Sequence, residues 1–169
     1  SQALSEAADY AQSAAFPSEI GISPNTAFPQ ESALFEETVL LSETQNLEEV
    51  LQELDAGFSE TLLHLIDRTG KKDSEIYKKA NVDRKLFSKI RNNKDYKPSK
   101  ITALAFAIAL ELTLEETREF IARAGFALSR SSKFDVIIEY FISTRNYDIF
   151  EINDALFDYD QPLLGNSRL

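Results

Sequence analysis

The chain has 169 residues, of which 43% are hydrophobic, and its net charge of −10 argues at first against a polyanionic partner. With no Cys and a single His, it lacks the ligands for a disulfide framework or a zinc site, so we expect no metal and no cofactor. It has no apolar run long enough to cross a bilayer and no secretory signal, so we expect a cytoplasmic protein without a membrane partner.

Residues 1–45 have the composition of an acidic arm. Residues 1–56 hold eleven acids and no base, and Pro17, Pro24 and Pro29 interrupt any helical period. We therefore expect residues 1–45 to be a largely disordered linker or arm. By pairing with the basic segment described below, residues 1–56 would compete with an anionic ligand, and salt would weaken that competition.

An amphipathic helix is predicted over residues 46–55. Asn46 and Glu49 form a start that resembles a capping box. The apolar residues that follow fall on one helical face, at Leu47, Val50, Leu51 and Leu54. This pattern fits either the first core helix or a docking helix, and the sequence does not choose between them.

From Phe58 onward the pattern is continuously helical. A helix is predicted over about 59–69, where apolar residues face inward and Gly70 supplies a left-handed stop. Asp73 is predicted to cap a second, shorter helix that ends near Ala80.

A tight turn is predicted at Asn81, a residue type that tolerates positive φ. Asp83 is predicted to cap the next helix, which runs to about Asn92. The Lys-Pro-Ser sequence at 97–99 is predicted to separate this helix from the next one. The helix over 99–111 is apolar on nearly every side, which predicts that it forms the buried centre.

Three further helices complete the predicted fold. Thr113 and Glu116 form a capping box that opens a helix ending at Gly125. Apolar residues within 134–142 recur at the spacing of an amphipathic helix, and Asp148 is predicted to begin another.

No segment alternates with a period of two, so the predicted fold class is all-α. After the arm at 1–45, we expect one domain over 46–126 and a helical extension over 127–169. Within that extension we interpret three acids as a solvated face, because they lack the spacing of a calcium loop: Asp154, Asp158 and Asp160.

Positive charge is concentrated in one part of the chain. Residues 68–100 hold twelve Lys or Arg and four acids, a local charge of +8. Such clustering is the electrostatic footprint of a binding surface. The same region carries two short helices joined by a tight turn, with a longer helix behind them. That spacing predicts a helix-turn-helix, in which the first short helix aims the second at a surface.

Four groups of residues carry a more specific likeness: Glu75-Ile76-Tyr77, Asn81-Val82-Asp83, Phe87-Ser88-Lys89-Ile90, and Pro98-Ser99 with Ala107-Ile108-Ala109-Leu110. Register for register, they resemble the Cro/lambda-repressor-like, or XRE-type, helix-turn-helix family. The resemblance implies a five-helix bundle, here with two or more additional C-terminal helices. It also implies a regulatory module for double-stranded DNA that acts as a homodimer, with the helices after Gly125 supplying the interface.

The resemblance assigns the second short helix, residues 83–92, to the major groove. On matching positions it implies base contacts by Arg84, Lys85, Ser88 and Lys89. Contacts to phosphates, which give affinity without sequence preference, are implied for Lys78, Lys79, Arg91, Lys94, Lys97 and Lys100.

Three residues depart from the family pattern. Asp73 stands where Gln is common and would repel a phosphate, Tyr77 stands where a small Ala is usual, and Asp83 lies nearest the groove. The alternative is a helix-turn-helix-derived module for protein interaction or dimerisation that does not bind DNA.

Residues 129–165 resemble the tail of bacterial proteins that join such a module to an N-terminal macro domain. Macro domains bind or hydrolyse ADP-ribose derivatives, and one does not fit within residues 1–56. The resemblance therefore implies an attached or upstream macro domain. Because the chain begins at Ser1 and contains no Met, we interpret it as a fragment or a processed product. It has no Gly-rich phosphate loop and no nucleophile with a partner base, so we do not expect an enzyme.

Overall fold

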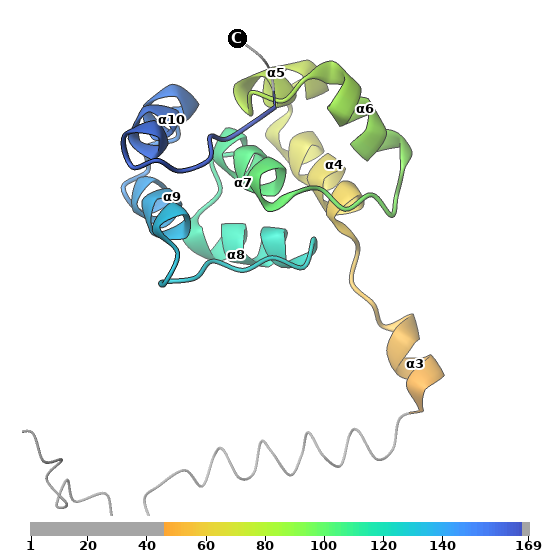
Figure 1. The fold of residues 1–169 in the computed structure, drawn as a ribbon. Helices are drawn as coiled ribbons and strands as arrows, with labels where there is room; N and C mark the ends of the chain where they lie inside the picture. The colour runs from red at the N-terminus through yellow and green to blue at the C-terminus, as the bar shows by residue number, and fades with distance from the viewer. Residues whose placement is uncertain (1–45, 167–169) are drawn as a thin grey trace, which may run out of the picture. The chain divides into compact units, whose positions relative to one another are not determined.

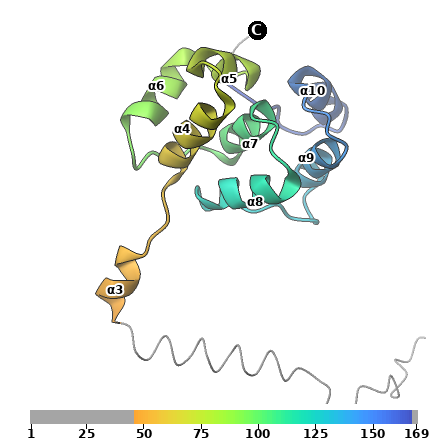
Figure 2. The same cartoon turned by 180° about the vertical axis from the view of Figure 1, so that it is seen from behind.

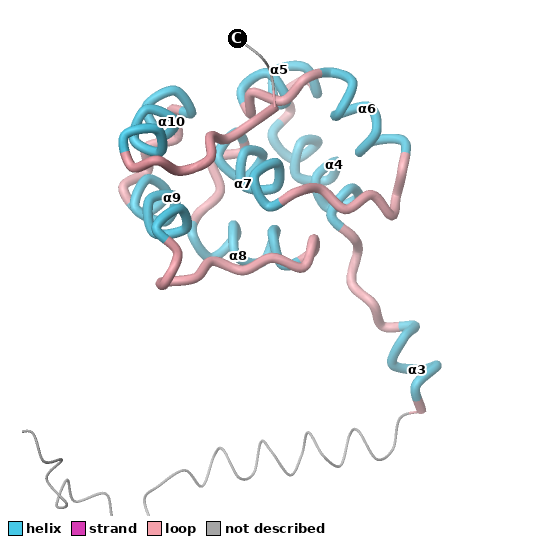
Figure 3. Tube along the Cα trace, in the orientation of Figure 1, coloured by secondary structure: helices cyan, strands magenta, loops and turns pink. Residues whose placement is uncertain are grey.

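The computed structural model describes residues 46–166, and the chain divides into two units, Ser1–Leu54 and Asp55–Leu169. The arm expected at 1–45 lies outside the described residues. Within 46–166 every element is a helix and there is no strand, which confirms the all-α class (Figure 3). The helices, labelled as in Figure 1, are α3 (Leu47–Gln52), α4 (Phe58–Thr69), α5 (Asp73–Lys79), α6 (Arg84–Asn92), α7 (Lys100–Ala109), α8 (Leu114–Ala122), α9 (Lys133–Ser143) and α10 (Ile149–Asp158).

Helix α3 belongs to the first unit. Asn46 caps it, as predicted, by accepting a hydrogen bond from the Glu49 N–H at 3.0 Å. None of the six residues of α3 is buried, and its Leu47 and Leu51 are 72% and 51% exposed. Whether it is a core helix or a docking helix stays a prediction.

Helix α7 is the centre of the second unit. Eight of its ten residues are buried, which confirms the predicted buried centre, and it contacts α5, α8 and α10 (Figure 1). Four alanines keep the helix narrow, so that its neighbours approach closely: Ala103, Ala105, Ala107 and Ala109.

Helix α4 contacts both α6 and α8, as the view from behind shows (Figure 2). Its inward face buries Leu62 and Ile66, as predicted, whereas His64 is exposed. The rings of Phe58 and Phe120 lie 4.6 Å apart and join the start of α4 to α8. Burial of these side chains supplies the driving force that holds α4 in place.

Most of the predicted helix starts are confirmed. Ser99, Thr113 and Asp148 each accept a backbone N–H at the start of α7, α8 and α10 respectively. The prediction that Asp73 caps α5 is wrong. Lys72 is the N-cap residue, and Asp73 is the first helical residue, where a carboxylate still favours the positive end of the helix dipole.

Helix α8 ends earlier than predicted. Its regular part stops at Ala122, and each N–H of Arg123, Ala124 and Gly125 donates to the carbonyl three residues before it. The last turn is therefore tightened before Gly125, whose φ of 82° ends it.

Helices α9 and α10 pack together, and they also contact α8 and α7 respectively. The predicted apolar faces are confirmed, since Ile138 and Ile142 of α9 and Ile152 and Leu156 of α10 are buried. Between the two helices, Tyr147 donates its hydroxyl to the Leu112 carbonyl at 2.8 Å. Burial raises the pKa of this tyrosine.

After α10, residues 161–166 run back to the turn between α5 and α6 (Figure 1), and we call this segment the C-terminal strap. The amide of Asn153 accepts from the Leu164 N–H at 2.7 Å and donates to the Leu164 carbonyl at 3.2 Å. The Asn166 N–H donates to the Asn81 carbonyl at 2.9 Å. Because Leu164 is buried as well, the strap is part of the packed domain.

We expect Gly165→Ala to destabilise the domain more than Gly70→Ala. Both glycines have positive φ, which costs an L-residue about 1–2 kcal/mol. A Cβ at Gly70 meets nothing within 4 Å, but one at Gly165 would lie 2.3 Å from the Asn81 carbonyl oxygen. The strap must therefore shift in the first variant only. Urea unfolding of both variants tests this, and equal losses would mean that the strap contact adds nothing to stability.

Candidate nucleic-acid interface

The turn between α5 and α6 has the predicted backbone geometry. Asn81 has a φ of 56°, and the Val82 N–H donates to the Tyr77 carbonyl at 2.9 Å. Asp83 then caps α6 by accepting from the Leu86 N–H at 2.7 Å, as predicted. One backbone hydrogen bond across the turn and one side-chain cap thus define how α6 begins after α5.

The inner face of α6 is held by aromatic packing. Phe87 and Ile90 are buried, and the Phe87 ring lies 5.2 Å from the ring of Tyr77 and 6.2 Å from that of Phe106. Tyr77, one of the three departures from the family pattern, therefore fills the space between α5 and α6. These contacts fix which face of α6 turns toward solvent.

The outer face of α6 gathers all four residues predicted to contact bases. Arg84, Lys85, Ser88 and Lys89 are exposed, because their spacing puts them opposite the buried residues of the helix. Together they line an open hollow of about 830 Å³. Its remaining lining residues, which the sequence reasoning did not single out, are Asn92, Asn93 and Tyr96.

The cationic surface continues past the end of α6. A second hollow of about 370 Å³ is lined by Arg91, Asn92 and Lys94 together with residues of α4. Lys78, Lys94 and Lys97 are exposed and make no ion pair within residues 46–166.

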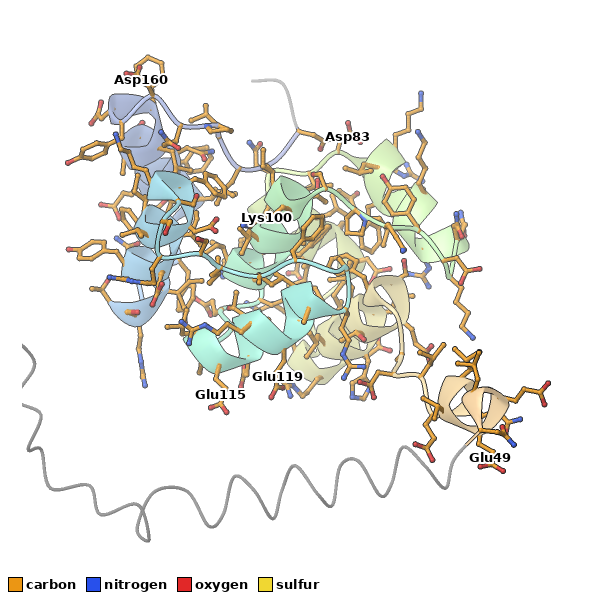
Figure 4. The ribbon with its side chains drawn as sticks, turned by 60° about the horizontal axis from the view of Figure 1, so that its bottom comes forward. Glu49, Asp83, Lys100, Glu115, Glu119 and Asp160 are labelled. Carbon is orange, nitrogen blue, oxygen red and sulfur yellow. The ribbon has the colours of Figure 1, made fainter. Side chains whose placement is uncertain are left out.

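The other three residues predicted to contact phosphates are ion-paired: Lys79 with Glu111 at 3.4 Å, Lys100 with Asp135 at 2.7 Å, and Arg91 with Asp73. The pair between Arg91 and Asp73 ties α6 to α5 and offsets the acid that departs from the family pattern. Lys100 lies at the start of α7 and turns to α9, away from the outer face of α6 (Figure 4).

The strap reaches the N-terminus of α6. The Asp83 N–H donates to the side-chain oxygen of Asn166 at 2.9 Å, and the Asp83 carboxylate accepts from the Asn166 amide at 3.1 Å. Asp83, the third departure from the family pattern, thus caps α6 and also forms hydrogen bonds with the strap. The sequence carries no local signal for this contact, because 83 residues separate the partners.

Residues 46–166 contain no group of three or more His, Asp or Glu side chains placed to hold a metal ion. No helix among them is both long and apolar enough to cross a membrane. Comparisons with family models, with curated proteins and with solved structures find no match to this chain.

Proposed function

We propose that α4–α8 form a Cro/lambda-repressor-like helix-turn-helix domain that binds double-stranded DNA, with α6 in the major groove. One observation carries the proposal: the outer face of α6 presents three cations and a serine to solvent, while its inner face is fixed by buried aromatic packing. A rigid cationic helix that projects from a domain is the form in which this class of protein reads base edges.

The chemistry of the outer face suits duplex DNA. Arg84 has the planar fork that donates to guanine O6 and N7, and Lys89 provides a second donor about one and a half turns further along the helix. Asn92 extends the face by another turn, and an asparagine amide pairs with adenine N6 and N7. We therefore add Asn92 to the four residues proposed to contact bases.

The proposed phosphate contacts divide according to their ion pairs. Lys78, Lys94 and Lys97 are exposed without an ion pair among the described residues, so they are the first candidates. Lys79 and Arg91 would have to leave a carboxylate to reach a phosphate. Lys100 is omitted, because it neutralises a buried acid.

We expect Lys94→Ala to weaken binding to every duplex sequence alike. Each phosphate contact adds about 0.9 to the slope of log K against log salt, so the variant should lose about one unit of slope. Fluorescence anisotropy with a labelled duplex at a series of salt concentrations measures it. Lys133→Ala, which removes an exposed cation of α9, is the matched control. Identical slopes for both variants would remove Lys94 from the interface.

We further propose that the protein acts as a cytoplasmic regulator and as a homodimer on a palindromic site. Two-fold symmetry would place two α6 helices one helical turn of DNA apart, about 34 Å. Sedimentation of the complex with a palindromic duplex should give two chains per duplex. A macro domain attached upstream remains part of this proposal.

A second candidate function is a module for protein interaction or dimerisation that has lost DNA binding. The three ion-paired cations favour it, because they reduce the free positive charge: Lys79, Arg91 and Lys100. It predicts stable self-association in light scattering together with no salt-dependent binding to duplex DNA. The first candidate, which is also proposed to be a dimer, differs in predicting binding to duplex DNA that weakens as salt rises.

A further inference from the structure

Helix α10 and the C-terminal strap enclose a groove of about 380 Å³, which we call the α10 groove. Four of its lining residues come from α10 at helical spacing, three come from the strap, and one from the turn before α6. They are Phe150, Asn153, Asp154, Phe157, Leu163, Leu164, Gly165 and Asn81. None of these residues was assigned to the DNA interface.

The groove exposes large apolar side chains. Phe150 and Phe157 are 61% and 72% exposed, and Leu163 is 46% exposed. The two phenylalanines are seven residues apart on α10, so they lie on the same face of the helix. The opposite face of α10 already buries Ile152 and Leu156 in the core. A contiguous apolar patch of this kind, left uncovered, marks an interaction site.

The polar surroundings of the groove are acidic. Asp154 lies between the two phenylalanines along α10, Asp158 lies one turn beyond it, and Asp160 follows the helix (Figure 4). No basic residue lines the groove, and these three aspartates make no ion pair within residues 46–166. The groove therefore disfavours nucleic acid and attracts a cationic partner.

A second copy of the chain fits poorly. Symmetric pairing of two α10 faces would bring the aspartates of both copies, Asp154 and Asp158, into one interface, and like charges repel. The outer face of α6 offers cations but no large apolar side chain. Helix α3 offers exposed leucines, but Glu48 and Glu49 in its first turn are negatively charged, as the groove is.

We propose that the α10 groove docks an amphipathic helix of another protein, with apolar side chains on one face and Lys or Arg beside them. The apolar side chains would pack between Phe150, Phe157 and Leu163, and the cations would pair with Asp154 and Asp158. Helices bind hydrophobic grooves in this way through anchors at i, i+3, i+4 and i+7. This inference does not depend on DNA binding, because it uses none of the residues of the α6 face.

The probe is a synthetic 18-residue helix-forming peptide with Leu on one face and Lys on the other. Titration into the full chain, uniformly labelled with ¹⁵N, should shift the amides of α10 and the strap. Fluorescence anisotropy should give an affinity at least tenfold higher than that of a Leu/Glu peptide of the same pattern. A peptide with the same Leu and Lys in scrambled order, which has no apolar face, should also bind at least tenfold more weakly.

Two variants test the groove directly. Phe157→Ser removes an exposed anchor and Asp154→Lys reverses the central charge, and each should weaken binding of the Leu/Lys peptide at least tenfold. Circular dichroism checks that each variant still folds. If one of them does not fold, the binding result of the other still tests the groove. The control is Glu115→Lys with Glu119→Lys, exposed acids that project from α8 (Figure 4), which should leave binding within twofold. Shifts spread over α8, or an equal loss in the control, would overturn the proposal.

Discussion

Replacing Arg84 and Lys89 together by alanine is expected to lower the affinity for a preferred duplex by about 100-fold, since each good contact to a base contributes about 1–3 kcal/mol of discrimination. Both side chains are exposed on the outer face of α6, so the fold does not depend on them. Affinity for unrelated duplexes should fall much less, because the proposed phosphate contacts outside α6 would remain.

The charge-matched control is Arg130→Ala with Lys133→Ala. These two cations precede and begin α9, and they are exposed. Their loss changes the net charge by the same amount but should leave both specific and non-specific binding within about twofold, since distant exposed charges are screened by salt. Equal losses in the two double variants would mean that DNA responds only to net charge and not to the α6 face.

The second large effect is a loss of stability: we expect Lys100→Met to lower the free energy of unfolding. Only 1% of the Asp135 side chain is exposed, and its Oδ2 accepts from Lys100 Nζ and from the Ser129 N–H, each at 2.7 Å. Its Oδ1 has no hydrogen-bond partner among the described residues. Removing Lys100 leaves a buried carboxylate without a counter-charge, and breaking such a pair costs about 3–5 kcal/mol. We expect about 3 kcal/mol, the lower end, because 29% of the Lys100 side chain reaches solvent.

A double variant separates the charge effect from packing. Lys100→Met with Asp135→Leu removes both charges, and it should recover most of the lost stability, because apolar replacements of a buried ion pair are often neutral or stabilising. Urea unfolding gives both free energies. If Lys100→Met alone lost less than about 0.5 kcal/mol, the pair would be no more than a surface contact.

The local structure of the candidate site could be predicted from the sequence because its causes are local. The positive φ of Asn81, the cap at Asp83 and the length of α6 follow from residue type and from spacing within a few positions. The outward direction of Arg84 and Lys89 follows in turn, since Phe87 and Ile90 had to face inward.

The rest depends on contacts that are distant in sequence. Lys100 meets Asp135 over 35 residues, and Asn166 meets Asp83 over 83 residues. Periodicity contains no information about such pairs, so Lys100 could not be distinguished from the free cations around it. The sequence did not indicate that Asp135 is buried either. A single acid near the start of a helix ordinarily faces solvent and interacts favourably with the helix dipole.

The central claim is that the exposed side of α6 reads duplex DNA, and selection from a random duplex library by the full chain tests it most directly. We predict that one sequence motif is enriched at low salt, and that Arg84→Ala relaxes the preference at one position of that motif. A library that stays unenriched, with no duplex retained even at 50 mM salt, would contradict the claim.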